Sequence, residues 1–160
     1  MIKAVLIAGL YANVAVGEEP SEQDGHYVWK DATTEVRVHP SSVNHDVGSK
    51  CKPAHPFVVY HEKVRTTRVF LRDCTVVAPE ALLLFGGALD VQHADARVVM
   101  DRWITIKCDA PIAVVFKYLR CALDADFARR IQSTGAARWS DSAEEDDETI
   151  VAIRRVLDER

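Results

Sequence analysis

Short stretches in which apolar and polar residues alternate recur through the first two thirds of the chain. They lie at residues 14–16, 26–30, 35–39, 57–64, 69–77, 89–93, 97–100 and 103–107. Because neighbouring side chains of a strand point to opposite faces, this period of two predicts short β-strands. Polar segments at 31–34, 65–68 and 94–96 separate successive stretches and predict the turns of hairpins.

Other segments have the spacing of apolar positions that favours helices. One covers residues 2–12, a second is a short turn over 80–85 opened by Pro79 and closed by two glycines, and a third begins near Asp109. The third carries a stripe of apolar residues at Ile112, Val115, Phe116, Leu119, Leu123, Phe127 and Ile131. We expect this stripe to pack into the core. Residues 150–157 predict one or two last turns of amphipathic helix.

This order of elements is typical of a mainly β fold with flanking helices. Many short strands with turn signals between them favour a small barrel or a sandwich over alternating βαβ units. A closed barrel also hides the edges of so many short strands. A length of 160 residues allows one ordinary domain with a substantial core.

Charge is distributed unevenly along the chain, although the net charge is only −4. Residues 37–72 contain seven Lys and Arg against two Asp and Glu, with four histidines, whereas residues 140–160 contain eight acids against three arginines. A net negative chain does not coat nucleic acid through bulk charge. The basic middle predicts a localised anion-binding face, and the alternative is an ordinary solvated surface.

The first 17 residues, MIKAVLIAGLYANVAVG, contain a lysine, a short apolar run and small residues, as a secretory signal does. The run is interrupted by Gly9 and its spacing also fits one face of a helix, so we favour a retained helix. The four cysteines form no CxxC pair, which favours a reducing, intracellular setting. No apolar run approaches the roughly 20 residues that a membrane-spanning helix needs, so no membrane association is expected.

Local catalytic motifs are absent: the sequence contains no GxxxxGK[ST], GxGxxG, GxSxG or HExxH. We therefore assign no catalytic residue. Potential metal ligands cluster at His39, His45, Cys51, His55 and His61. Only Cys51 and His55 have the close spacing that zinc sites use, so no metal site is expected. Catalysis by Cys51 or Cys74 with a loop histidine is the weakest alternative.

The remaining candidate is a basic strand–turn–strand segment. It contains Lys63, Arg65, Thr66, Thr67 and Arg68. Lysine and arginine neutralise phosphates, while hydroxyl groups fix the nucleic-acid backbone or touch base edges. The segment therefore predicts a nucleic-acid-binding loop.

An earlier block, HPSSVN, adds polar side chains to this candidate site. They are His39, Ser41, Ser42 and Asn44. Trp29, Tyr60 and His61 are candidate stacking surfaces for bases. The structural alternative is that Trp29 and Tyr60 belong to the core and that the two serines only cap the turn after Pro40.

Three segments together carry a resemblance to a known family. They are IKAVLIAGLYANVA, VRVHPSSVN and FVVYHEKVRTTRVFLRDCTVVAPEALLLFGG. In this order they resemble the C-terminal OB-fold domain of DEAH/RHA-type (DExH-box) ATP-dependent RNA helicases, over roughly residues 2–131. The chain departs from the family at Ala12, where a proline is usual.

The resemblance implies a small OB-fold-like β-barrel within residues 1–135, preceded by a short helix and followed by a longer one. Beyond the resemblance, the run of serines and acids predicts that residues 136–149 are an acidic, mobile linker, and apolar spacing predicts a short C-terminal helix over 150–160. The implied ligand is single-stranded RNA, facing the loop from Lys63 to Arg68, with His39, Ser41 and Ser42 in the block before it. The implied partners are the helicase motor domains, in cis or in trans, and a G-patch-type activator protein.

The motor domains of the family are missing from this sequence, and ATP and Mg²⁺ belong to those domains, so no cofactor is expected here. The chain is expected to be a detached module, a truncated gene product or a stand-alone relative. The favoured function is an RNA-binding accessory module without ATPase activity. The alternatives are a docking module for an acidic partner or a helicase activator, without intrinsic nucleic-acid binding, and an enzyme that uses the Cys/His loop.

Overall fold

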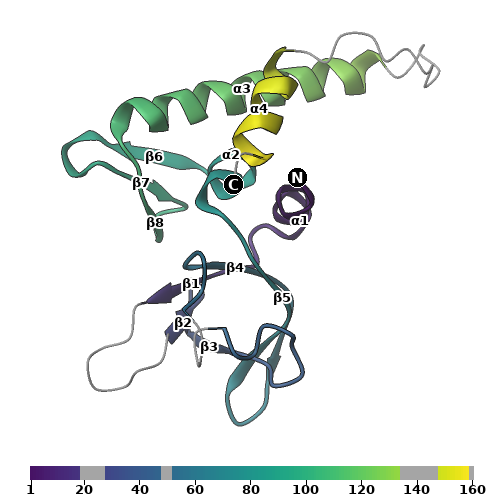
Figure 1. The fold of residues 1–160 in the computed structure, drawn as a ribbon, viewed down its shortest axis with the longest axis vertical. Helices are drawn as coiled ribbons and strands as arrows, with labels where there is room; N and C mark the ends of the chain where they lie inside the picture. Colours follow the sequence, from purple (N-terminus) through teal and green to yellow (C-terminus); the bar gives the residue numbers. More distant parts are fainter. Residues whose placement is uncertain (19–27, 48–51, 134–147, 159–160) are drawn as a thin grey trace.

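The computed structural model describes residues 1–18, 28–47, 52–133 and 148–158, and it consists of a β-barrel below a layer of helices and a small sheet (Figure 1). Cys51 and most of the expected linker at 136–149 lie outside these residues. Residues 148 and 149 already belong to the last helix. The division of the chain into segments at residues 135 and 149 stays a prediction.

Five strands close into the barrel. They are β1 (Val14–Glu18), β2 (Val28–Lys30), β3 (Glu35–Val38), β4 (Phe57–Arg65) and β5 (Val69–Val76). Their order around the barrel is β1-β2-β3-β5-β4. The β3–β5 pair is parallel and the other pairs are antiparallel. A closed five-stranded barrel with this strand order is the OB-fold architecture, so the expected fold class is confirmed.

The second layer contains the remaining elements. They are α1 (Ile2–Leu10), α2 (Pro79–Phe85), β6 (Leu89–Gln92), the 3₁₀ turn η1 (His93–Asp95), β7 (Arg97–Met100), β8 (Ile104–Lys107), α3 (Ala110–Ser133) and α4 (Glu148–Asp158). The strands β6, β7 and β8 form an antiparallel sheet of their own. Helix α3 lies along this sheet, and α4 packs against α3 and α2 (Figure 1). Periodicity predicted these three strands correctly, but they do not belong to the barrel.

The first half of β4 is buried on both faces. Val58 and Tyr60 point into the barrel, where they pack in one hydrophobic cluster with Leu71. Phe57 and Val59 point the other way and pack in a second cluster with the helices. A continuous apolar run such as FVVY is what a strand covered on both sides requires. From His61 onward the side chains of the strand become mostly exposed.

The apolar stripe of α3 is core only in part. Phe116 and Leu123 are buried, but Ile112, Val115, Phe127 and Ile131 are exposed, with Ile131 at 74%. The expectation that the whole stripe packs into the core is therefore wrong. The helix is covered along a narrow line that runs through Ala113, Phe116 and Leu123, because the described elements that lie against it are the small sheet and the short helices α2 and α4.

The two glycines after α2 allow the β7–β8 turn to approach closely. A Cβ on Gly86 would meet Met100 Sδ and the Leu82 carbonyl oxygen, and a Cβ on Gly87 would meet the Asp101 carboxylate. The Arg120 guanidinium donates hydrogen bonds to the carbonyl oxygens of both glycines. Gly86 and Gly87 therefore form the point at which α2, α3 and the small sheet meet.

We expect Gly86→Ala to lower the free energy of unfolding by about 1–3 kcal/mol, because the added methyl group overpacks a site with no free volume. Gly9→Ala is the matched control: Gly9 lies within α1, and a Cβ there meets nothing within 4 Å. That change should raise stability by about 0.5–1 kcal/mol through helix propensity. Urea unfolding of both variants measures the two effects. Equal stability of the two alanine variants would contradict the packing explanation.

Candidate nucleic-acid interface

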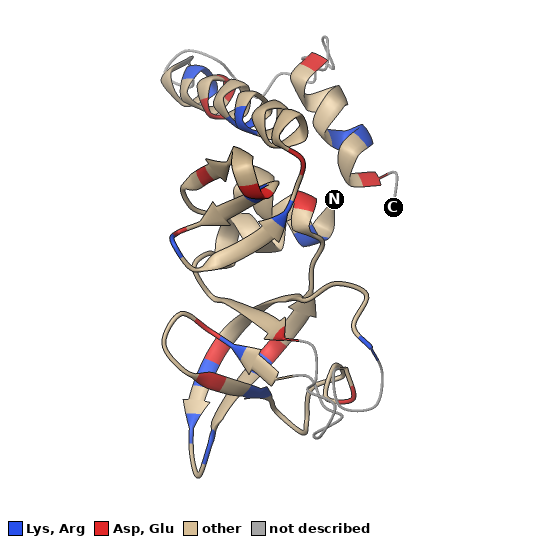
Figure 2. Cartoon of the chain, turned by 90° about the vertical axis from the view of Figure 1, so that its left-hand side faces the viewer, with Lys and Arg blue, Asp and Glu red and all other residues tan. Residues whose placement is uncertain are grey.

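The tip of the β4–β5 hairpin projects away from the helix layer and carries basic residues on both of its strands (Figure 2). The last pair of the ladder joins Arg65 to Val69, and the Thr66 amide donates a 2.9 Å hydrogen bond to the Arg68 carbonyl oxygen. Arg65, Thr66, Thr67 and Arg68 are all exposed. Neither arginine forms an ion pair with any residue in the described part of the chain. The tip therefore presents two guanidinium groups that no described residue neutralises.

Lys63 belongs to the same hairpin but has a different environment. Its ammonium lies 2.6 Å from Asp31 Oδ2, in the turn between β2 and β3. The other carboxylate oxygen of Asp31 accepts hydrogen bonds from the amide and hydroxyl of Thr33 (2.8 and 2.9 Å) and from the Thr34 amide (2.7 Å). The Asp31 side chain is only 5% exposed, against 38% for Lys63. Lys63 thus joins strand β4 to the turn between β2 and β3.

The Asp31 carboxylate is strongly stabilised in its charged form. Burial alone raises its pKa, but the Lys63 ammonium and the hydrogen bonds from Thr33 and Thr34 outweigh that effect and lower the pKa to about 2. The pKa of Lys63 is raised in turn, mainly by its hydrogen bond to Asp31. Both groups are therefore charged throughout the physiological pH range.

The other cations on the outer surface of the barrel lie beside acids. Lys30 contacts Glu18 at 2.6 Å, Arg37 contacts Glu35 at 3.9 Å and Arg72 contacts Glu62 at 3.8 Å. These exposed pairs are individually weak, but they leave the barrel wall close to neutral. Uncompensated positive charge on the described part of the barrel is consequently concentrated at the hairpin tip.

The residues of the HPSSVN block form a local turn. Ser41 donates a backbone hydrogen bond of 3.1 Å to His39 Nδ1, and its hydroxyl lies 2.7 Å from the same atom. The Ser42 hydroxyl accepts a 3.3 Å hydrogen bond from the Asn44 amide. The ring of His39 also contacts Phe70 edge to face, with centroids 5.6 Å apart. These contacts are the turn-capping role that the sequence allowed for the two serines.

This turn lies beside the middle of β5, where the His39 amide donates a hydrogen bond to the Leu71 carbonyl oxygen and the Asn44 side chain donates one to the Cys74 carbonyl oxygen. Ser41 and Ser42 line a polar hollow of about 330 Å³ together with Glu62, Arg72 and Asp73. Arg68 and Asp73 are five residues apart, or roughly 17 Å along a strand. The structure therefore brings Lys63, Arg65, Thr66, Thr67 and Arg68 together on the hairpin. Ser41 and Ser42 line the hollow beside Arg72 and Asp73, and His39 contacts Phe70 at the start of β5. Two carboxylates in the hollow make it a poor site for phosphate.

The expected stacking surfaces differ in accessibility. Trp29 and Tyr60 are only 4% and 6% exposed and fill the barrel interior, so neither offers a face to a base. His61 is exposed on β4. Only the last of the three remains a candidate for stacking.

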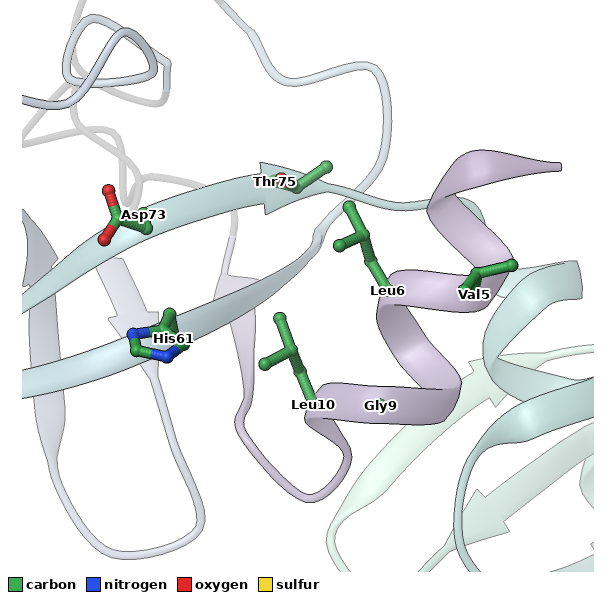
Figure 3. A pocket seen from close by; sticks show the side chains of 7 residues that line it. All are labelled: Val5, Leu6, Gly9, Leu10, His61, Asp73 and Thr75. Atoms are coloured by element: carbon green, nitrogen blue, oxygen red, sulfur yellow. The ribbon is translucent and has the colours of Figure 1, made fainter.

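An apolar hollow of about 510 Å³ lies between α1 and the middle of the β4–β5 pair (Figure 3). Leu6 and Leu10 of α1 form one wall, and His61, Asp73 and Thr75 form the other. Asp73 has a positive φ of 50° and interrupts the regular pairing of β5 with β4. The hollow lies between the hairpin base and α1, and it adds no basic side chain to the site.

Cysteine and metal chemistry find little support in the described residues. Burial, with a smaller contribution from Asp73, raises the pKa of the Cys74 thiol to about 12, so this thiol is not a nucleophile at neutral pH. No three His, Cys, Asp or Glu side chains lie close enough together to hold a metal ion within residues 1–18, 28–47, 52–133 and 148–158. No helix in those ranges is long and apolar enough to cross a membrane.

Asp31 is the residue beside the candidate site whose contact with Lys63 sequence reasoning missed. The DATT segment was expected only as a polar turn, and an Asp that accepts bonds from the two following Thr residues fits that expectation. Its partner Lys63 is 32 residues away. Nothing in the local pattern of either residue indicates the pair.

Asp31→Asn should lower the free energy of unfolding at about pH 7 by about 1–2 kcal/mol, because the pKa shift from 3.8 to about 2 is lost and solvent reduces its effect. Because the pKa of Asp31 is lower in the folded state than in the unfolded state, its carboxylate stabilises the folded state above pH 3.8. This stabilisation disappears as the pH falls toward 2. The difference between wild type and variant should therefore shrink in urea unfolding at about pH 2.5. A difference independent of pH would exclude the ion pair as its cause.

Comparison with known proteins matches the chain to two domain families. Residues 2–89 match the oligonucleotide/oligosaccharide-binding (OB) fold, and residues 96–159 match the C-terminal domain in RNA helicases. The first match contains the whole barrel and α2, and the second contains most of the small sheet with α3 and α4. The boundary between the matches falls at β6, after α2 and within the second layer.

Individual relatives agree with these matches. The chain is 38% identical over 146 residues to DExH-box ATP-dependent RNA helicase DExH4, chloroplastic, of Arabidopsis thaliana, and 37% identical over 138 residues to ATP-dependent RNA helicase DHX29 of Homo sapiens. It is 34% identical over 157 residues to ATP-dependent DNA/RNA helicase DHX36 of Homo sapiens. These matches cover 84%, 83% and 96% of the chain but only 10%, 10% and 15% of the relatives. The barrel, the two domain matches and these relatives together show that the chain belongs to the C-terminal OB-fold family of DExH-box RNA helicases.

Proposed function

We propose that this chain is a single-stranded RNA-binding accessory module of a DExH-box helicase, without an ATPase site of its own. OB folds bind oligonucleotides with the face of strands 2 and 3 and with the loops that join strands 1–2 and 4–5. The β4–β5 hairpin is the second of these loops, and the connection at 19–27 lies outside the described residues. The observation that carries the proposal is the pair of unneutralised, exposed arginines, Arg65 and Arg68, at the tip of this loop.

Binding by this tip is directed mainly at the phosphate backbone. Guanidinium groups form two-pronged hydrogen bonds with phosphate oxygens, and Thr66 and Thr67 add exposed hydroxyl groups beside them. The large aromatic side chains Trp29 and Tyr60 are enclosed in the barrel and leave His61 as the stacking candidate. Affinity should therefore depend strongly on salt and little on base sequence.

The proposed partners follow from the family. The chain spans 10–15% of the curated relatives named above, and the proposal places it beside helicase motor domains, in cis or in trans, together with a G-patch-type activator. Exposed apolar side chains on α1, with Ile2 at 80% and Val5 at 69%, provide contact area for such a neighbour. The thiols of Cys74, Cys108 and Cys121 are free, and the proposed setting of the chain is intracellular.

The same apolar surface favours a second candidate function, a docking module that binds the motor domains but not RNA. In that case the arginines at the tip would meet acidic groups of a protein. The two candidates differ in one measurable property, because only the first predicts binding of isolated RNA by this chain.

We expect Arg65→Gln/Arg68→Gln to weaken binding of a single-stranded oligouridylate by about tenfold or more, because each charged hydrogen bond contributes about 1.5–3 kcal/mol. Fluorescence anisotropy at about 50 mM salt measures the affinity. Lys107→Gln/Lys117→Gln is the matched control, since it removes the same charge from exposed positions on β8 and α3. The control should bind as the wild type does.

Equal losses in both double variants would mean that only net charge matters. No detectable RNA binding by the wild type would contradict the proposed function and favour the docking module.

A further inference from the structure

We propose that Asp31 is a positioning residue that withholds Lys63 from RNA, so that Arg65 and Arg68 alone supply the phosphate-binding charges of the hairpin. The inference rests on the proposed function and specifies how its site works. It assigns Lys63 to an ion pair within the protein and assigns Arg65 and Arg68 to RNA, although the three residues are close together in the sequence.

Strand geometry alone would make Lys63 a third phosphate ligand. Residues two apart on a strand share a face, so Lys63 and Arg65 point to the same side of β4. Lys63 is also within reach of the tip, two residues before the end of the strand. Its ammonium is instead directed at the β2–β3 turn, where it lies 2.6 Å from Asp31 Oδ2.

The Asp31 carboxylate is a stronger competitor than a surface acid. Three hydrogen bonds from Thr33 and Thr34 fix one of its oxygens, and the side chain is 95% covered. A phosphate that captured Lys63 would leave this carboxylate without its counter-charge, which is strongly unfavourable for a covered ion. The exposed pairs on the barrel wall, such as Arg72 with Glu62 at 3.8 Å, lack this protection.

The arrangement also fixes the hairpin. Asp31 belongs to the turn between β2 and β3, and neither of these strands is a neighbour of β4, which carries Lys63. The ion pair therefore connects β4 to the β2–β3 turn, although β4 forms no ladder with β2 or β3. The connection lies below the point where the hairpin tip extends into solvent. The base of the hairpin is held while the arginines beyond it stay exposed.

The salt dependence of RNA binding counts the phosphates that the protein neutralises. For single strands, the slope of log Kobs against log salt is about −0.7 per phosphate contact, so two arginines predict a wild-type slope of about −1.4. The probe is a fluorescein-labelled oligouridylate of about twelve nucleotides, titrated between about 50 and 200 mM salt. Arg65→Gln should reduce the slope to about −0.7.

Two variants test whether Asp31 withholds Lys63 from RNA or whether Lys63 binds phosphate in the wild type. Asp31→Asn keeps an oxygen for the turn but no longer holds the ammonium, so Lys63 becomes available and the slope should steepen to about −2.1. Asp31→Asn/Lys63→Met removes both charges and should return the slope to the wild-type value. This double variant avoids the unpaired carboxylate that Lys63→Met alone would leave, and circular dichroism checks that it is folded.

A slope about 0.7 shallower in the double variant than in the wild type would show that Lys63 binds phosphate and would overturn the inference while leaving the proposed function intact. An unchanged slope in Asp31→Asn would also overturn it. If the wild type shows no salt-dependent RNA binding, the proposed function fails and the inference fails with it.

Discussion

The structure depends on a single strand that is buried on both faces. The first half of β4 contributes Val58 and Tyr60 to the barrel interior and Phe57 and Val59 to the core under the helices. Two small hydrophobic cores thereby share one backbone, and the barrel is anchored to the helix layer along this strand. The second half of β4 is mostly exposed. The same strand that joins the layers therefore carries the hairpin into solvent.

Electrostatics then distinguishes the tip of this hairpin from the rest of the barrel. Cations on the wall lie next to carboxylates of the same or a neighbouring strand, as Lys30 does with Glu18. Lys63 is paired more tightly, with a covered carboxylate. Arg65 and Arg68 lie beyond the reach of these acids because the hairpin extends past them. A chain with a net charge of −4 can in this way present a small cationic site without becoming basic overall.

Periodicity predicted the elements well and their packing less well. Each expected strand is present in the described residues, and the short helix after Pro79 spans the expected region. The apolar stripe of α3 was different, since Ile112 and Ile131 have the spacing of core residues but remain exposed. A helical period shows that one face is apolar, but it does not show whether enough protein lies against that face to cover it. Assignment of β6, β7 and β8 to a separate sheet likewise depends on which strands pair, which no local pattern encodes.

The candidate site shows the same difference between what local patterns predict and what packing decides. The amino-acid sequence by itself determined the strands, the turn between Arg65 and Arg68 and the concentration of basic residues there, because these follow from local alternation and composition. Only the tertiary structure decided that His39, Ser41 and Ser42 form a separate turn, that Trp29 and Tyr60 are enclosed, and that Lys63 is paired with Asp31. These outcomes depend on barrel closure, which brings residues distant in sequence within hydrogen-bonding distance and thereby decides which charges and rings are left for a ligand.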